Sequence, residues 1–81
     1  MHPALKLVVE RFSCVRERAE LLFERDEPFR ELSEEYQVCT DAAARLEGGG
    51  RANEALRKEY GALRLRLEGE LLRYLSEHPD A

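Results

Sequence analysis

Two cysteines and two histidines are the side chains of this sequence that could hold a structural zinc ion, and the cysteines are also its two thiols. Cys14 and Cys39 form no Cys-x-x-Cys pair, and His2 and His78 lie at opposite ends of the chain, outside the segments that we expect to pack. A structural zinc site needs four ligands in short paired spacings, which these residues do not provide. We therefore expect no metal and no cofactor. Two thiols in a reducing compartment are most often small buried side chains, with a functional disulfide as the alternative.

Catalysis by a hydroxyl nucleophile or by general acid and base groups needs partners that this sequence does not arrange. The candidate nucleophiles are Ser13, Ser33, Thr40 and Ser76. Only Ser76 has a histidine nearby, His78, and both lie at a fraying chain end. The abundant carboxylates fall at helix-surface spacings beside basic residues, as in the pairs Asp41–Arg45, Glu54–Lys58 and Arg66–Glu70. We interpret them as solvated, because acid–base catalysis needs a desolvated pocket, and we expect no catalytic residues.

Two breaks in the helix-forming sequence define the elements that position these groups. Asp26-Glu27-Pro28 joins a helix N-cap residue to a proline that only the first turn tolerates, so one helix ends near Glu24 and the next begins near Glu27. Gly48-Gly49-Gly50 supplies positive φ angles for a helix end and a tight reversal between antiparallel helices. No Lys-Ser or Lys-Thr pair follows the glycines, so they do not form a phosphate-binding loop.

The hydrophobic period predicts three helices, at about residues 3–24, 27–47 and 51–77. Apolar side chains recur in each at alternating three- and four-residue steps. They are Leu5, Val8, Phe12, Val15, Ala19 and Leu22 in the first, Phe29, Leu32, Tyr36, Cys39, Ala43 and Leu46 in the second, and Leu56, Tyr60, Leu63, Leu67, Leu71 and Tyr74 in the third. We predict an all-α fold in which the second and third helices form a long antiparallel hairpin with coiled-coil-like packing. The first helix packs on this hairpin or crosses to a neighbouring chain.

Length and charge exclude several classes of protein. The 81 residues make one small domain, with 43% hydrophobic and 37% charged residues. Acidic residues outnumber basic ones by 17 to 13 and interrupt every basic stretch, which argues against nucleic-acid binding. No apolar run reaches the length of a signal-peptide core or a membrane helix, so we expect a cytoplasmic protein without a membrane partner.

The first and third predicted helices carry more apolar surface than a single stripe. Leu7, Cys14 and Leu21 recur every seven residues on the first helix, and Leu65 and Leu72 form a second row on the third. A chain of this size seldom gains more than about 3–5 kcal/mol from its own core, and oligomerisation is a common remedy. We therefore expect a homodimer with these five residues in its interface. The alternative is that they are partly exposed without consequence.

Several short motifs follow the predicted first helix. They are Asp26-Glu27-Pro28-Phe29-Arg30-Glu31-Leu32 with Tyr36, then Leu46-Glu47, then Leu63-Arg64-Leu65-Arg66-Leu67-Glu68, and then Glu70-Leu71 and Leu75. In these motifs the chain resembles the YdcH-like family of small bacterial proteins, over about two thirds of its length. The resemblance implies a short opening helix, an acidic-Pro-Phe junction and a long antiparallel helical pair. It implies no established activity and therefore no site residue.

Together these features favour a small non-catalytic interaction or adaptor protein that self-associates, with a further protein partner left open. The alternative is a small all-helical enzyme that resembles chorismate mutase, or a regulatory subunit of an enzyme. Such mutases bind a dicarboxylate with inward arginines and a lysine, whereas this chain has eleven arginines but only Lys6 and Lys58 as lysines. An enclosed pocket with converging Arg and Glu side chains would favour the enzyme, and open grooves with apolar patches would favour the interaction protein.

Overall fold

The computed structural model describes residues 1–47 and 50–78, the side chains of residues 51 and 52 excepted. Within this part of the chain all regular structure is helical. The elements are α1 (Pro3–Arg11), a 3₁₀-helix η1 (Ser13–Val15), α2 (Arg16–Arg25), α3 (Glu27–Leu46) and α4 (Arg51–Glu77). The prediction of an all-α fold is confirmed. The molecule is elongated, with extents of 46 × 23 × 21 Å.

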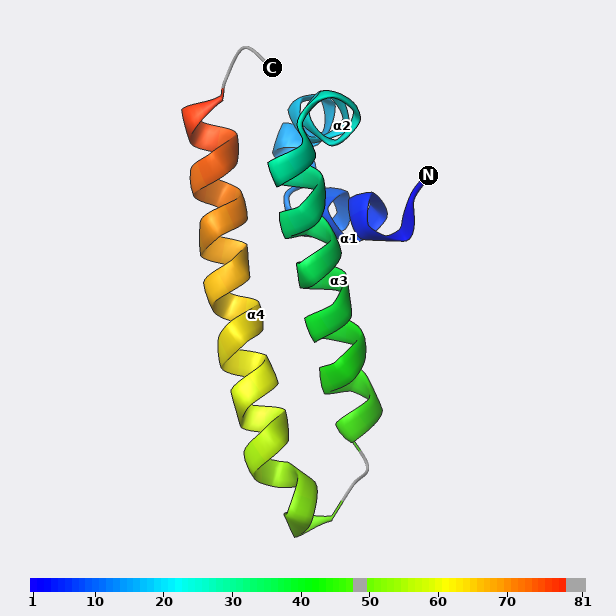
Figure 1. Ribbon diagram of the computed structural model, residues 1–81, viewed down its shortest axis with the longest axis vertical. Helices are drawn as coiled ribbons and strands as arrows, with labels where there is room; N and C mark the ends of the chain where they lie inside the picture. The colour runs from blue at the N-terminus through cyan, green and yellow to red at the C-terminus, as the bar shows by residue number, and fades with distance from the viewer. Residues whose placement is uncertain (48–49, 79–81) are drawn as a thin grey trace.

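The long axis is an antiparallel pair formed by α3 and α4, which lie side by side (Figure 1). The predicted junction before α3 is confirmed, since a carboxylate oxygen of Asp26 accepts a hydrogen bond from the backbone N–H of Phe29 at 3.1 Å and Pro28 lies in the first turn. At the other end of α3, Gly48 and Gly49 of the predicted turn lie outside the described residues. Gly50 precedes α4 with a φ of −68°, so the positive φ that we predicted for the turn is not found at this glycine.

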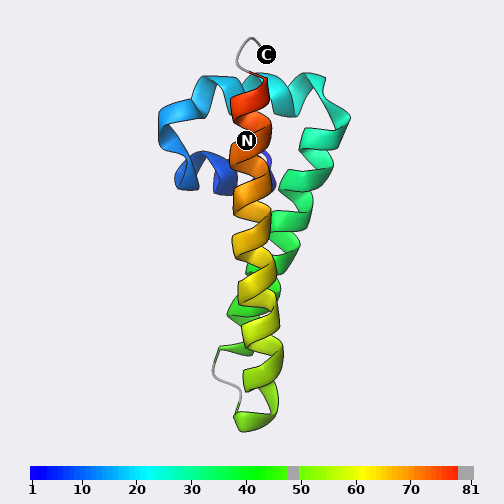
Figure 2. The same cartoon turned by 90° about the vertical axis from the view of Figure 1, so that its left-hand side faces the viewer.

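The prediction of one continuous helix over about residues 3–24 is wrong. The chain leaves helical geometry at Phe12, where φ is −124° and ψ is 60°, and it passes through η1 before α2 begins. The residues from Phe12 to Val15 are an aromatic residue, Ser, Cys and a β-branched residue, all weak helix formers. Neither proline nor glycine marks this break. As a result, α1 and α2 fold back on one another and lie together beside the hairpin (Figure 2).

The hydrophobic core lies where these two short helices meet the hairpin. The buried core cluster consists of Leu5, Val8 and Val9 of α1, Phe12 at the break, Ala19 and Leu22 of α2, Phe29, Tyr36 and Cys39 of α3, and Leu67, Leu71 and Leu75 of α4. Most of them belong to the predicted stripes, although Val9 and Leu75, outside the stripes, are also buried. Leu56, which the third stripe includes, is 46% exposed, so the stripe does not predict burial along the whole helix.

Burial divides the molecule into two regions. The capped half comprises residues 3–39, from α1 to the first part of α3, and residues 67–78 at the end of the hairpin, and it holds every buried residue that the structure describes. The open arm comprises residues 40–46 of α3 and the described part of residues 50–66 of α4, where each side chain is half-buried or exposed. Figure 2 shows the cause, because α1 and α2 lie beside the upper part of the hairpin only.

Candidate functional site

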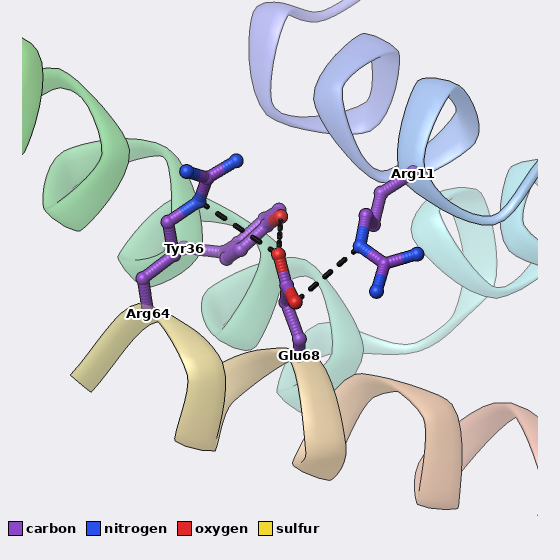
Figure 3. A network of polar contacts seen from close by, with 4 residues as sticks. All are labelled: Arg11, Tyr36, Arg64 and Glu68. Atoms are coloured by element: carbon purple, nitrogen blue, oxygen red, sulfur yellow. Dashed lines mark hydrogen bonds and ion pairs between the residues drawn. The ribbon is translucent and has the colours of Figure 1, made fainter. Parts of the chain in front are cut away.

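A cluster of polar side chains lies inside the capped half, centred on Glu68 of α4 (Figure 3). The hydroxyl of Tyr36 donates a hydrogen bond to Oε2 of this glutamate at 2.5 Å. The Nε of Arg11 lies 3.3 Å from Oε1, and the Nε of Arg64 lies 3.7 Å from Oε2. The Glu68 side chain is 11% exposed, so its charge is held by groups of the same chain rather than by water.

Three helices supply this cluster. Arg11 is the last residue of α1, Tyr36 lies in the middle of α3, and Arg64 and Glu68 are one turn apart on α4. The guanidinium of Arg64 also lies 5.8 Å from the ring centre of Tyr36, in cation–π range. The cluster therefore fixes the end of α1 against both arms of the hairpin.

The chemistry of this cluster is that of a buried carboxylate between two arginines and a tyrosine, in which the Nε of Arg64 lies too far from Glu68 for a hydrogen bond. Burial and the hydrogen bond to Glu68 both raise the pKa of Tyr36 above its usual value of 10.0, so the hydroxyl stays a donor near neutral pH. Both oxygens of Glu68 face donors of the chain itself. Oε2 of Glu68 accepts the hydrogen bond of Tyr36 and the Nε of Arg11 faces Oε1, so the contacts of this carboxylate are with groups of the same chain.

A second polar junction connects the start of α3 to the end of α4. The Tyr74 hydroxyl donates a hydrogen bond to Oδ1 of Asp26 at 2.6 Å, and the Tyr74 ring stacks on His78 with a centroid separation of 4.1 Å. The hydrogen bond from Tyr74, and then that from the backbone of Phe29, hold the pKa of Asp26 below its usual value of 3.8. The same bond raises the pKa of Tyr74 to about 12. Asp26 thus caps α3 and anchors α4 with one carboxylate.

Both histidines have structural contacts that their terminal positions did not predict. Nδ1 of His2 accepts a hydrogen bond from the backbone N–H of Ala4 at 3.0 Å, which caps α1, and the His2 ring packs on Phe23 at 5.1 Å. His78 stacks on Tyr74 and lies against the last turn of α4. His78 is half-buried, so the expectation that it lies outside the packed region is wrong, whereas His2 is exposed. In the described residues, no group of three or more His, Cys, Asp or Glu side chains is placed to hold a metal.

The two cysteines are free and differ in environment. Cys39 is buried in the core, as predicted, and burial followed by the charge of Glu35 raises the pKa of its thiol above 9.0. Cys14 is exposed on η1, so the prediction of a buried side chain is wrong there. The break after α1 accounts for this, because it moves residue 14 off the helix face on which the sequence placed it.

The five predicted interface residues do not form one surface. Leu7 is half-buried and packs against the protein's own core, while Cys14 and Leu21 line a shallow concavity of η1 and α2. Leu65 and Leu72 are 68% and 51% exposed on α4. The row predicted on the first helix is divided by the break, whereas the row on α4 is continuous and uncovered by the chain itself.

The predicted surface ion pairs are formed in two of three cases. Lys58 pairs with Glu54 at 3.6 Å and Arg66 with Glu70 at 3.7 Å. Arg45 instead directs its Nε to the backbone carbonyl of Asp41 at 3.4 Å. These contacts are solvent-exposed and contribute little to stability.

The sequence did not predict three side chains that make contacts inside the molecule, and only their positions around the helix indicate these contacts. Glu68 lies three residues before Leu71, about 60° around α4 from the centre of the core stripe, so a helical wheel places it at the edge of the core. Arg18, which donates from Nη1 to the carbonyl of Leu75 at 3.1 Å, lies between the two predicted apolar rows. Ser33 is fully buried and donates to the carbonyl of Phe29 one turn earlier. Only the wheel position indicates these roles.

Comparison with known proteins adds no relative from which a function could be inferred. The chain matches no protein-family profile, no curated protein and no solved structure. The resemblance to YdcH-like proteins therefore stays a prediction. Among the residues that the structure describes, no helix combines the length and the apolar character needed to cross a membrane.

Proposed function

We propose that this protein is a small non-catalytic helical interaction protein of the cytoplasm that associates with a second copy of itself. The observation that carries the proposal is the row of Leu65 and Leu72 on α4, two leucines one heptad apart that are each more than half exposed. Large apolar side chains in such a row gain burial when a second helix covers them. The free thiols support a reducing compartment.

The five predicted interface residues contribute unequally in this proposal. Leu65 and Leu72 form the centre, because they are the most exposed leucines of the set. Cys14 and Leu21 add a smaller patch on η1 and α2. Leu7 contributes least, since its side chain already packs on its own core.

The convergence of Arg11 and Arg64 on Glu68 does not favour the mutase-like alternative. The Nε of Arg11 and the Nε of Arg64 both face Glu68 of the same chain, and neither arginine lines the concavities between α3 and α4. The concavities between α3 and α4 are open grooves lined by other residues. Open grooves and exposed apolar rows are the features expected of an interaction protein.

Light scattering on a size-exclusion column tests self-association at micromolar concentration. The wild-type chain is expected at twice its 9.4 kDa, and a variant with Leu65→Gln and Leu72→Gln is expected at 9.4 kDa with unchanged helicity by circular dichroism. Val38→Gln is the matched control, because Val38 is 62% exposed on a different face of the hairpin and its replacement leaves the α4 row intact. A monomeric wild-type chain, or a double variant that still dimerises, contradicts the proposal.

A further inference from the structure

A groove runs along the seam between α3 and α4, on the side that α1 and α2 leave uncovered. Where the capped half meets the open arm, the groove has a concavity of about 500 Å³. Its apolar lining, which we call the floor, consists of Val38, Cys39, Leu63 and Leu67. A second concavity of about 400 Å³ continues from Val38 along the open arm, past Leu56 and Tyr60. Val38 lines both concavities, so they adjoin along the same side of the α3–α4 seam, and we refer to them together as the groove.

The groove is acidic at one end and basic at the other. Glu31, Glu34 and Glu35 line it at the capped half, and Arg45 lines it near the turn. In the described part of the chain none of these three glutamates forms an ion pair. Three uncompensated negative charges beside an apolar floor are complementary to a ligand that is apolar on one face and positively charged along one half.

We propose that this groove binds a basic amphipathic helix of another protein. Such a helix places apolar side chains at i, i+3, i+4 and i+7 into the floor, and its Lys and Arg residues over Glu31, Glu34 and Glu35. From residue 31 to residue 46 the seam is about 22 Å long, which accommodates about four helical turns. The bound helix adds a layer along the seam from the capped half into the open arm, where the chain itself supplies only two helices.

The groove is separate from the surface proposed for self-association. Leu63 and Leu65 are two residues apart on α4, so they point about 160° away from one another around the helix axis. On α3, Glu35 lies about 160° around the helix from the fully buried Ser33. A dimer formed through Leu65 and Leu72 therefore leaves the groove free, and the two activities are tested independently.

The probe is a fluorescein-labelled synthetic peptide of about 18 residues, a length sufficient for about five helical turns. Leucines occupy the i, i+3, i+4 and i+7 positions, lysines fill the polar positions of one half, and glutamines fill those of the other. Fluorescence anisotropy with the full chain is expected to show binding that weakens with added salt. A control peptide with glutamates in place of the lysines is expected to bind at least about tenfold more weakly.

Matched variants locate the binding site. Replacing Glu31, Glu34 and Glu35 together with Gln is expected to weaken peptide binding by about tenfold, from three surface charge contacts. The control replaces three exposed glutamates of α1 and α2, namely Glu10, Glu17 and Glu24, with Gln. The net charge changes by the same amount in both triple variants, but the control residues do not line the groove, so less than about a twofold change in peptide affinity is expected. Equal weakening by both triple variants overturns the proposal, because it means that net charge alone attracts the peptide.

A second pair of variants tests the apolar floor. Val38→Lys places a positive charge in the groove and is expected to abolish binding of the lysine peptide, whereas Leu65→Lys on the other face is expected to leave binding unchanged even where it disrupts the dimer. Circular dichroism checks that both variants fold. If Val38→Lys does not fold, the triple glutamine variants still decide the question, because they change only exposed positions. In an NMR titration with the lysine peptide, we expect chemical-shift changes of the backbone amides along residues 31–46 and 56–67. Shifts centred on Leu65 and Leu72 contradict the proposal.

Discussion

Both the capped half and the open arm contain parts of α3 and α4, yet only the capped half has a buried core. In the capped half α1 and α2 cover the α3–α4 seam, and Tyr36, Leu71 and Leu75 are fully buried. In the open arm the same seam has no third layer, and Leu56 is 46% exposed. Two helices have only one contact line between them, so a side chain in that line stays open to solvent on both sides unless another element covers it.

The comparison shows that helix continuity is not the same as stability. The 27 residues of α4 form one helix that passes through both regions. Its capped part is held by core packing and by the Glu68 and Asp26 contacts, whereas its other part relies on surface ion pairs and helix propensity. We expect the molecule to open locally from the turn end, because local opening begins where few apolar contacts are buried.

The largest predicted effect separates the two regions within one helix. Leu71→Ala removes a fully buried side chain of the capped half and is expected to cost about 2–5 kcal/mol of the free energy of unfolding. Leu56→Ala, in the open arm, is expected to cost less than about 1 kcal/mol, because that side chain is 46% exposed. Urea unfolding followed by circular dichroism measures both. Equal costs would show that the open arm is covered in solution.

The next effect concerns the Glu68 cluster. Tyr36→Phe removes the hydroxyl that donates to the buried carboxylate and is expected to cost about 1–3 kcal/mol. Tyr60→Phe is the matched control in the open arm, and a change within about 0.5 kcal/mol is expected because no described contact uses its hydroxyl. If Tyr36→Phe is neutral in urea unfolding, the hydrogen bond between Tyr36 and Glu68 does not stabilise the contact of α3 with α4.

A smaller effect depends on pH at the α3 junction. The folded pKa of Asp26 lies below the usual 3.8, so its stabilising contribution is fully present above about pH 4 and is lost as the pH falls through the lowered value. Asp26→Ala is expected to cost about 1 kcal/mol at pH 7 through loss of the N-cap, and much less at pH 2. Thermal unfolding at the two pH values measures this difference. A cost for Asp26→Ala that is the same at both pH values contradicts the assignment.

The smallest effect is a stabilisation of the open arm. A methyl group added at Gly61 meets no atom within 4 Å, so Gly61→Ala is expected to raise the free energy of unfolding by about 0.5–1 kcal/mol through helix propensity. Gly69→Ala tests the same change in the capped half, where space is also free. Thermal unfolding at low protein concentration measures both. A destabilising Gly61→Ala would mean that another backbone approaches the arm closely.

The sequence predicts the core of this molecule better than its shape. Stripes at three- and four-residue steps identify buried residues such as Val8 and Phe29, because burial follows the side-chain period whether or not the helix is continuous. The break at Phe12 is not predicted, since it results from weak helix formers and from packing rather than from proline or glycine.

The candidate sites are predicted only in part, for a similar reason. The row of Leu65 and Leu72 follows from the period of α4 alone, and the structure leaves it exposed. The Glu68 cluster and the acidic groove each combine side chains of different helices. Which helices meet, and at what register, is fixed by tertiary packing, so no spacing within one helix indicates these sites.

The contact between Arg18 and Leu75 has a consequence for the order of folding. These residues are 57 positions apart in the chain, whereas α3 and α4 meet across a short turn. Closing a long loop costs more chain entropy than closing a short one, so contacts near in sequence form first. We expect the hairpin to assemble early and α1 and α2 to dock afterwards, with the arginine contact as one of the last to form. Destabilising substitutions in α1 should then speed unfolding while leaving the folding rate nearly unchanged.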